Sequence, residues 1–101
     1  MKETYLFVTY ITKPGQRETF LREMAERGVT EAIRAEDGCL QYDYYLSIQN
    51  ENEILLAERW TSPEKQQVHM GQPHMTHITE LKEKYVESTT LRWMSEEDHA
   101  V

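Results

Sequence analysis

Residues 39–60 read CLQYDYYLSIQNENEILLAERW, and they predict a β-hairpin. Residues 39–48 and 53–60 are rich in aromatic, β-branched and aliphatic side chains, a composition typical of strands. The polar segment QNEN at 49–52 is short enough to pair the two strands directly. Because side chains alternate between faces, Leu40, Tyr42, Tyr44, Leu46 and Ile48 share one face of the first strand. Ile54, Leu56, Glu58 and Trp60 share one face of the second.

An amphipathic helix is expected immediately before the hairpin. Lys13-Pro14-Gly15 is a turn sequence at which this helix opens, and Glu36-Asp37-Gly38 supplies the turn that ends it. Between the two turns, apolar side chains recur in steps of one and three residues, the spacing of one face of a single helix. The stripe consists of Phe20, Leu21, Met24, Ala25, Gly28, Val29, Ala32 and Ile33.

A strand that is apolar on both faces is expected at the start of the chain. Residues 4–12, TYLFVTYIT, have the composition of a strand, and both faces of it need covering. Leu6, Val8 and Tyr10 form one face, and Tyr5, Phe7 and Ile11 form the other.

Two helices and a last strand are expected after the hairpin. Ser62 followed by Pro63 favours a helix start, because serine caps free amides and proline fits the first turn. This short helix is interrupted at residues 71–73, and a longer helix is expected from about His74 to Tyr85. Residues 86–94, VESTTLRWM, then predict the final strand.

The resulting order, β-α-β-β-α-β, predicts an α+β fold of the ferredoxin-like split βαβ type. Its helices cover only one face of a four-stranded sheet, so an apolar second face needs a partner. We therefore expect a homodimer whose sheets pack face to face, with Leu6, Val8 and Tyr10 available for burial there. The alternative is a monomer whose second face is only mildly amphipathic.

Composition restricts the class of protein. A chain of 101 residues is one domain, expected over residues 1–94 and followed by a flexible acidic tail at 95–101. Eleven Lys and Arg against 18 Asp and Glu give a net charge of −7, which disfavours nucleic acid and anionic membranes as partners. There is neither an apolar run long enough to span a membrane nor a signal-like segment. The single cysteine, Cys39, favours the cytoplasm.

Several short segments together resemble the antibiotic biosynthesis monooxygenase (ABM) domain family. They are Lys13-Pro14-Gly15, Glu36-Asp37-Gly38-Cys39, Tyr42-Asp43-Tyr44-Tyr45, Glu58-Arg59-Trp60, and His69 followed by Gln72-Pro73-His74-Met75. The resemblance implies a dimeric α+β barrel with a pocket between each sheet and its helices. Members include cofactor-independent oxygenases of quinols and polyketide aromatics, haem-degrading enzymes, and an isomerase of a phosphorylated quorum-signal breakdown product.

The resemblance is closest to the quinol-type and phospho-isomerase branches. Polyketide-type oxygenases carry Asn four residues before the Trp and Tyr six residues after it, where this chain has Leu56 and Gln66. Haem-degrading members use an Asn on the first strand and a Trp near the position of His69, and this chain has neither. No dinucleotide or P-loop motif is present, so no cofactor is expected and the substrate must supply the electrons.

Four residues are candidate catalytic groups. Glu58 shares a strand face with Trp60, and desolvation there would raise its pKa and make it a base; the alternative is a structural ion pair with an Arg or Lys. The resemblance implies that Trp60 lines the pocket, where its N–H could bond an oxygen atom; the alternative is a packed core aromatic. His69 and His74 match histidines of the quinol-type branch and could take a phenolic proton; His74 could instead cap a helix.

Five further residues are expected to line the substrate pocket: Leu56, Tyr42, Tyr44, Met75 and Phe7. His74, His77 and Glu80 share one helical flank, but their spacing lacks the i, i+4 histidine pair of helical zinc sites. No metal site is therefore predicted.

The leading functional hypothesis is a cofactor-independent monooxygenase acting with O₂ on a quinol-like or related small aromatic molecule. One alternative is an isomerase of a small phosphorylated dione, which needs a cationic phosphate grip. Arg59 alternates away from Trp60 and so does not serve that grip. Another is a non-enzymatic ligand-binding stress-response module, which predicts a pocket without a titratable group.

Overall fold

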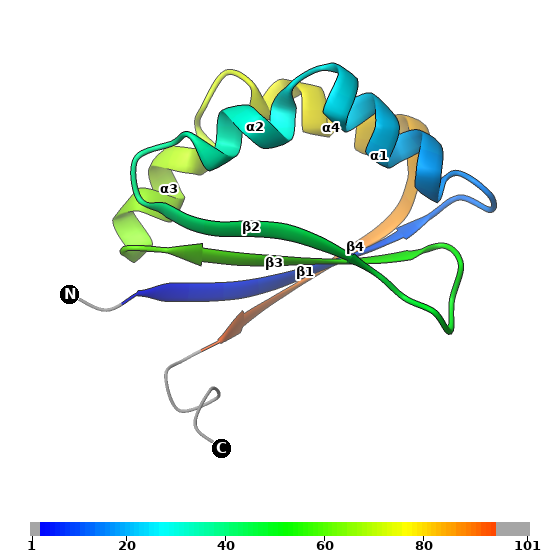
Figure 1. Ribbon diagram of the computed structural model, residues 1–101, viewed down its shortest axis with the longest axis horizontal. Helices are drawn as coiled ribbons and strands as arrows, with labels where there is room; N and C mark the ends of the chain where they lie inside the picture. The colour runs from blue at the N-terminus through cyan, green and yellow to red at the C-terminus, as the bar shows by residue number, and fades with distance from the viewer. Residues whose placement is uncertain (1–2, 95–101) are drawn as a thin grey trace.

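The computed structural model describes residues 3–94, and it has the predicted ferredoxin-like architecture. Four antiparallel strands form one sheet in the order β2-β3-β1-β4 (Figure 1). The predicted tail at 95–101 lies outside the described residues. The elements are β1 (Thr4–Thr12), α1 (Arg17–Glu26), α2 (Val29–Arg34), β2 (Cys39–Leu46), β3 (Glu53–Trp60), α3 (Pro63–Met70), α4 (Met75–Tyr85) and β4 (Val86–Met94).

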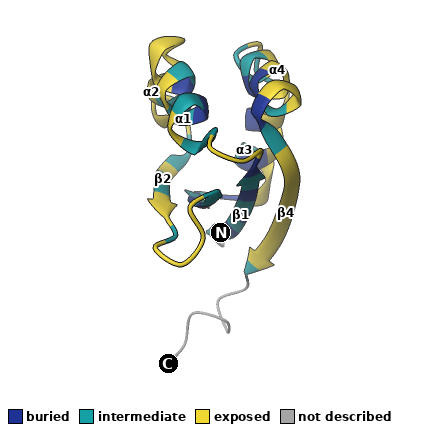
Figure 2. Ribbon diagram, turned by 90° about the vertical axis from the view of Figure 1, so that its right-hand side faces the viewer, coloured by how far each residue is buried: buried dark blue, intermediate teal, exposed yellow. Residues whose placement is uncertain are grey.

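All the helices lie on one face of the sheet (Figure 1). Figure 2 shows α1 and α2 over β2, and α4 over β4, with the buried residues between helices and sheet. None of the helices described has the length that a membrane crossing requires, since the longest has 11 residues. The core includes Phe20 and Met24 of α1, Ile33 of α2, Leu56 of β3 and Leu81 of α4.

The two faces of β1 have the opposite roles from those expected for the dimer. Leu6, Val8 and Tyr10 point toward the helices and are at most 5% exposed. They are therefore not available to a second sheet, and that part of the prediction was wrong. The uncovered face of β1 carries Tyr5 and Phe7, which are half-buried.

The predicted single helix is broken into α1 and α2 at Gly28. This glycine has a φ of 69°, a left-handed conformation that an α-helix does not contain. The hydrophobic stripe continues through the break, because Phe20 and Met24 of α1 and Val29 and Ile33 of α2 are all buried. The break redirects the chain without moving the stripe off the sheet.

The predicted apolar face of β2 is only partly realised. The pairing of β2 with β3 shifts register between Cys39 and Gln41, which leaves Leu40 unpaired and 45% exposed. The strand ends at Leu46, and Ile48 beyond it is fully exposed. Tyr42 alone of the five predicted residues is completely buried.

The second helical segment begins as predicted. Ser62 caps α3 by accepting a hydrogen bond from the backbone N–H of Lys65 at 3.2 Å, and Pro63 occupies the first turn. After the interruption, α4 begins at Met75, and the side chain of His74 makes no capping hydrogen bond. His74 is therefore free to bond elsewhere.

Candidate functional site

A cavity of about 190 Å³ lies between the sheet and helices α3 and α4. Most of its walls are apolar, and its polar side chains come from several elements far apart in sequence. The lining residues are Leu6, Val8, Tyr10, Tyr42, Glu58, Gln66, His69, Met70, Met75, Ile78, Thr79, Lys82, Thr89 and Leu91. This cavity brings together Tyr42, Glu58, His69 and Met75 from the predicted site residues.

Glu58 is a buried carboxylate in this cavity. It is 6% exposed, and its Oε1 accepts a hydrogen bond from Nε1 of Trp60 at 3.0 Å. Burial raises the pKa of Glu58 to about 7, while the bond from Trp60 opposes the rise and the nearby Glu36 adds to it. No Arg or Lys among residues 3–94 forms an ion pair with Glu58. The carboxyl can therefore exchange a proton near neutral pH.

The indole N–H of Trp60 is occupied by this bond. Trp60 is fully buried and lies behind His69, with ring centroids 4.6 Å apart and planes tilted by 32°. It does not line the cavity, so the predicted hydrogen bond from Trp60 to a bound oxygen atom has no support in the geometry. Trp60 instead holds Glu58 and His69 in place.

His69 is held by a second carboxylate, Glu36. Nδ1 of His69 lies 2.9 Å from Oε2 of Glu36, and Nε2 of His74 lies 2.7 Å from the same oxygen. Since Nδ1 of His69 is engaged, Nε2 is the nitrogen left for chemistry, and it lies 4.0 Å from Oε1 of Glu58. His74 thus reaches the site only through Glu36.

Sequence reasoning missed Glu36, which was interpreted only as part of the turn that ends a helix. It precedes β2 in the loop, and nothing in its local sequence distinguishes it from the acidic residues of exposed loops, although its side chain is only 9% exposed. The folded chain places it between histidines 33 and 38 residues away.

Two tyrosines form part of the cavity wall. Burial raises the pKa of both Tyr10 and Tyr42 well above the usual range, so both hydroxyls remain protonated at neutral pH. The Tyr42 ring meets His69 edge-on, with centroids 6.0 Å apart. Protonated hydroxyls of this kind can donate hydrogen bonds but do not act as bases.

Glu36, His69 and His74 are also the residues that could hold a metal ion. One ligand atom of each lies within 4.8 Å of the others, and two imidazoles with one carboxylate suit a transition metal. In this structure they bond to one another. His77 and Glu80, the other metal candidates considered from the sequence, contact Arg27 instead, at 3.2 and 3.3 Å.

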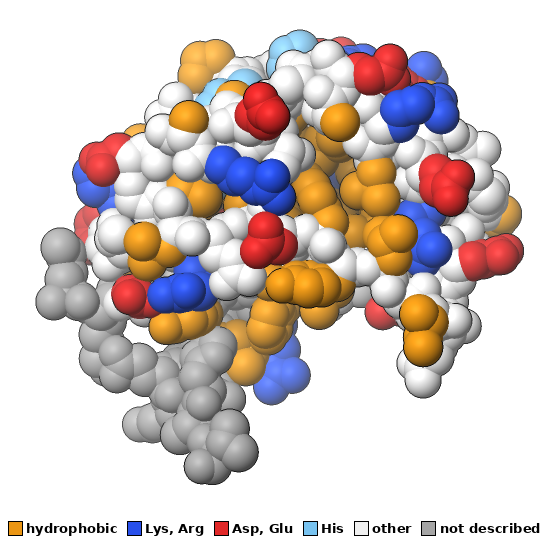
Figure 3. Space-filling view, in the orientation of Figure 1, with side chains coloured by type: hydrophobic (Ala, Val, Ile, Leu, Met, Phe, Trp, Pro, Cys, Tyr) orange, Lys and Arg blue, Asp and Glu red, His pale blue; other side chains and the backbone are white. Residues whose placement is uncertain are grey.

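Three of the predicted lining residues lie elsewhere. Leu56 is on the correct face but fully buried beneath other side chains. Tyr44 lines a separate hollow of about 450 Å³ between α1, α2 and β2, where hydrophobic side chains gather at the centre of Figure 3. Phe7 lies on the opposite face of the sheet, so the structure does not bring it to His69.

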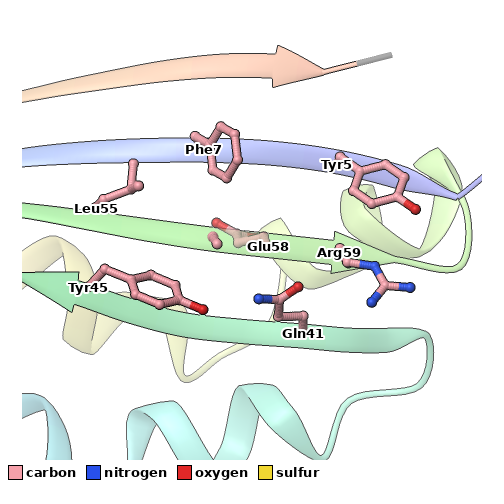
Figure 4. A pocket seen from close by; sticks show the side chains of 8 residues that line it. Tyr5, Phe7, Gln41, Tyr45, Leu55, Glu58 and Arg59 are labelled. Carbon is pink, nitrogen blue, oxygen red and sulfur yellow. The ribbon is translucent and has the colours of Figure 1, made fainter. Parts of the chain in front are cut away.

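The uncovered sheet face has a broad groove of about 670 Å³, shown in Figure 4. Arg59 lies at one end of it, donates a hydrogen bond to Glu3 at 2.9 Å, and lies 5.4 Å from the centroid of the Tyr5 ring. As predicted, Arg59 points away from Trp60. The residues that line the groove are Tyr5, Phe7, Gln41, Tyr45, Leu55, Ala57, Glu58 and Arg59.

Comparison with known proteins shows what the chain is similar to. A family model described as antibiotic biosynthesis monooxygenase matches residues 5–81, whereas no curated protein sequence matches. A solved Pseudomonas aeruginosa structure has a TM-score of 0.82 at 22% identity and covers 93% of each chain. A Mycobacterium tuberculosis structure has a TM-score of 0.79 at 24% identity, over 93% of this chain and 94% of that one. A structure described as an antibiotic biosynthesis monooxygenase has a TM-score of 0.79 at 20% identity, over 91% and 96%.

Proposed function

The chain belongs to the antibiotic biosynthesis monooxygenase family, some members of which are monooxygenases, and we propose that it oxidises a quinol-like aromatic molecule with O₂ without a cofactor. The observation that carries the proposal is the pair formed by Glu58 and His69 in a cavity whose walls are mostly apolar. Two proton-accepting groups in a water-poor site are what such a reaction requires of a protein.

The first proposed step removes a proton from the substrate hydroxyl. Nε2 of His69 accepts this proton, and Glu36 at Nδ1 keeps the ring in the required orientation. Glu58, 4.0 Å from Nε2, stabilises the imidazolium that forms. The two carboxylates thus act on opposite edges of one imidazole.

The electrons come from the substrate. The quinolate transfers one electron to O₂, and the resulting semiquinone and superoxide combine to give a ring hydroperoxide. Loss of water from this hydroperoxide leaves a new carbonyl. In total, a ring C–H and a hydroquinone become a hydroxyquinone, and the O₂ molecule ends as one carbonyl or hydroxyl oxygen and one water. The balance is complete with substrate and O₂ alone.

The cavity supports a small substrate. Its volume of about 190 Å³ is below the range of about 300–1,000 Å³ typical of pockets for drug-sized ligands, which suits a molecule of one or two rings. Leu6, Val8, Ile78 and Leu91 supply flat apolar contacts, and Met75 supplies a compliant one.

Oxygen consumption tests the proposal. Metal-stripped protein is given a panel of hydroquinones and anthrones, and uptake is measured above the autoxidation rate. His69→Ala is expected to lower the catalysed rate at least about 100-fold, the contribution typical of a general base. His77→Ala, on α4 but bonded to Arg27, is the matched control and is expected to retain the rate. Equal losses in the two variants, or no uptake with any substrate, would overturn the proposal.

The two alternatives receive less support from the geometry. An isomerase of a phosphorylated dione needs several cations, but Arg59 lies on the opposite face and Lys82 is the one cationic side chain lining the described cavity. A simple binding module predicts no titratable group beside the ligand, whereas Glu58 and His69 both line the cavity. The oxygenase is therefore the function we propose.

We further propose that the protein is a homodimer through its uncovered sheet face and that it works in the cytoplasm. The groove of about 670 Å³ on that face is lined by aromatic and aliphatic side chains that no helix covers. A second copy of the same sheet offers a surface of the same apolar chemistry. The cytoplasmic location rests on the single cysteine.

A further inference from the structure

The proposed oxygenase cavity has two chemically different ends. One end holds Glu58, which lies opposite Leu6 of β1. The other end lies at the backbone of Tyr10, four residues further along the same strand and about 13 Å from the backbone of Leu6 at the usual rise per residue. Both positions face the helices, so the cavity runs along β1 between them.

A lysine stands at the end remote from Glu58. Nζ of Lys82 lies 5.8 Å from the centroid of the Tyr10 ring, and Lys82 lines the cavity. On α4, Met75, Ile78, Thr79 and Lys82 follow at helical spacing and form one wall. Seven residues separate Met75 from Lys82, or about 10 Å along the helix, which agrees with the length along β1.

The Lys82 ammonium has no anionic partner within residues 3–94. Its Nζ lies over the face of the Tyr10 ring. The salt bridges among the described residues all involve other cations. The remaining lining near it is uncharged: Thr89, which pairs with Tyr10 across the strands, contributes a hydroxyl. A cation beside apolar walls is better stabilised with an anion in contact.

The rest of the molecule does not attract anions, because the net charge is −7. Selection of an anionic ligand must therefore be local, and Lys82 is positioned for it. A single ammonium with a neighbouring hydroxyl suits a monoanionic group such as a carboxylate.

We propose that the cavity binds an aromatic substrate that carries a carboxylate at one end and its reactive hydroxyl at the other. The carboxylate pairs with Lys82 and Thr89, and the hydroxyl faces His69 and Glu58. Lys82 thus determines both specificity and orientation. This inference rests on the proposed function only in taking the cavity as the substrate site.

The test uses redox-inert ligands, so it does not depend on turnover. Binding of 6-hydroxy-2-naphthoate, with its two groups at opposite ends of the rings, is compared by fluorescence titration with that of 2-naphthol and 3-hydroxy-2-naphthoate. The wild-type protein is expected to bind 6-hydroxy-2-naphthoate about tenfold more tightly than either comparison ligand, as one charge-assisted hydrogen bond provides. The adjacent groups of 3-hydroxy-2-naphthoate cannot reach both ends.

Variants of Lys82 show whether this residue causes the tighter binding of 6-hydroxy-2-naphthoate. Lys82→Met is expected to abolish it, and Lys82→Arg to retain it. Lys84→Met is the matched control, because Lys84 lies on the same helix over the Tyr85 ring and does not line the cavity. A preference that survives in Lys82→Met, or equal binding of all ligands, would overturn the role of Lys82. Absence of saturable binding by any ligand would overturn the cavity as a site. The binding preference together with no oxygen uptake would contradict only the proposed reaction.

Discussion

At the scale of single residues, Glu58 is the buried carboxyl of the candidate site. Its carboxyl is buried among apolar residues, bonded by the Trp60 indole and next to the ring of His69. A carboxylate there is desolvated, which favours the neutral acid, and the single hydrogen bond from Trp60 only partly offsets this. Such a group changes charge near neutral pH, which is useful to catalysis and costly to the stability of the fold.

That cost gives a measurable pH dependence. The pKa of Glu58 rises from 4.5 unfolded to about 7 folded, so the folded state binds the proton more tightly. Stability is therefore lost as pH rises from about 4.5 to about 7 and stays constant above, with a total of up to about 3 kcal/mol. Glu58→Gln, which still accepts from Trp60, is expected to become more stable than the wild type across this interval.

Urea unfolding at several pH values measures the difference. Glu51→Gln, in an exposed loop, controls for the removal of one negative charge. A stability difference for Glu58→Gln that is constant from pH 4 to pH 8 would contradict the elevated pKa.

At the scale of elements, two glycines set the directions of the chain around the site. Gly28, with a φ of 69°, separates α1 from α2 and has open space where a Cβ would be. Gly38, with a φ of 90°, begins the approach to β2 and is tightly enclosed. Its carbonyl accepts the N–H of Thr61 at 2.8 Å, which ties the loop containing Glu36 to the end of β3. The position of Glu36 therefore depends on Gly38.

The two glycines are expected to respond differently to alanine. Gly28→Ala meets only backbone strain, about 1 kcal/mol. Gly38→Ala adds a clash, because its Cβ would lie 2.6 Å from Cγ of Lys65 and 2.8 Å from Oγ1 of Thr61. We expect a loss of about 2 kcal/mol or more for Gly38→Ala in chemical unfolding. Equal losses of unfolding free energy in the two variants would show that the close packing around Gly38 does not contribute to the cost of the substitution.

At the scale of the whole molecule, the sheet has one face buried under helices and one face uncovered. The uncovered face is not polar: Phe7 and Leu55 lie on it, together with Tyr45, which is 53% exposed. An apolar sheet face of this kind is unfavourable in water, and self-association removes it from solvent.

The proposed dimer is tested by a charge on that face. In a symmetric dimer, Phe7→Glu buries one carboxylate from each subunit in the interface. We therefore expect light scattering to show a monomeric variant at a concentration where the wild type is dimeric. Val68→Glu is the control, because Val68 is 59% exposed on α3, on the side of the helices. A monomeric wild type, or a Phe7→Glu variant that remains dimeric, would contradict the proposed interface.

Much of the fold follows from local sequence signals. The strand composition of residues 53–60 and the Ser62-Pro63 helix start each predict their element correctly, and the stripe ending at Ile33 predicts the buried helical face. The errors occur where one residue changes the geometry: Gly28 breaks a helix whose stripe continues, and the bulge at Leu40 disrupts the alternation of β2. The spacing of apolar residues along the chain shows neither the helix break at Gly28 nor the bulge at Leu40.

The candidate site is less predictable than the fold. The desolvation of Glu58 follows from its face on β3, because alternation places it among core residues. The indole N–H of Trp60, however, bonds to Glu58 and not to a ligand oxygen as the sequence suggested. One oxygen of Glu36 contacts both His69 and His74, which lie far from it in the sequence. Phe7 shows the same limit, since its strand was correctly identified but its face was assigned to the wrong surface.

The sequence alone determined the order of the elements, the apolar character of both sheet faces and the family resemblance, because each depends on residues close together in the chain. Only the tertiary structure decided which face of β1 the helices cover, that Glu36 orients His69, and that Lys82 lies at the far end of the cavity. Helices on either face would satisfy the same alternation. The packing of the whole chain is what selects one face and brings distant side chains into contact.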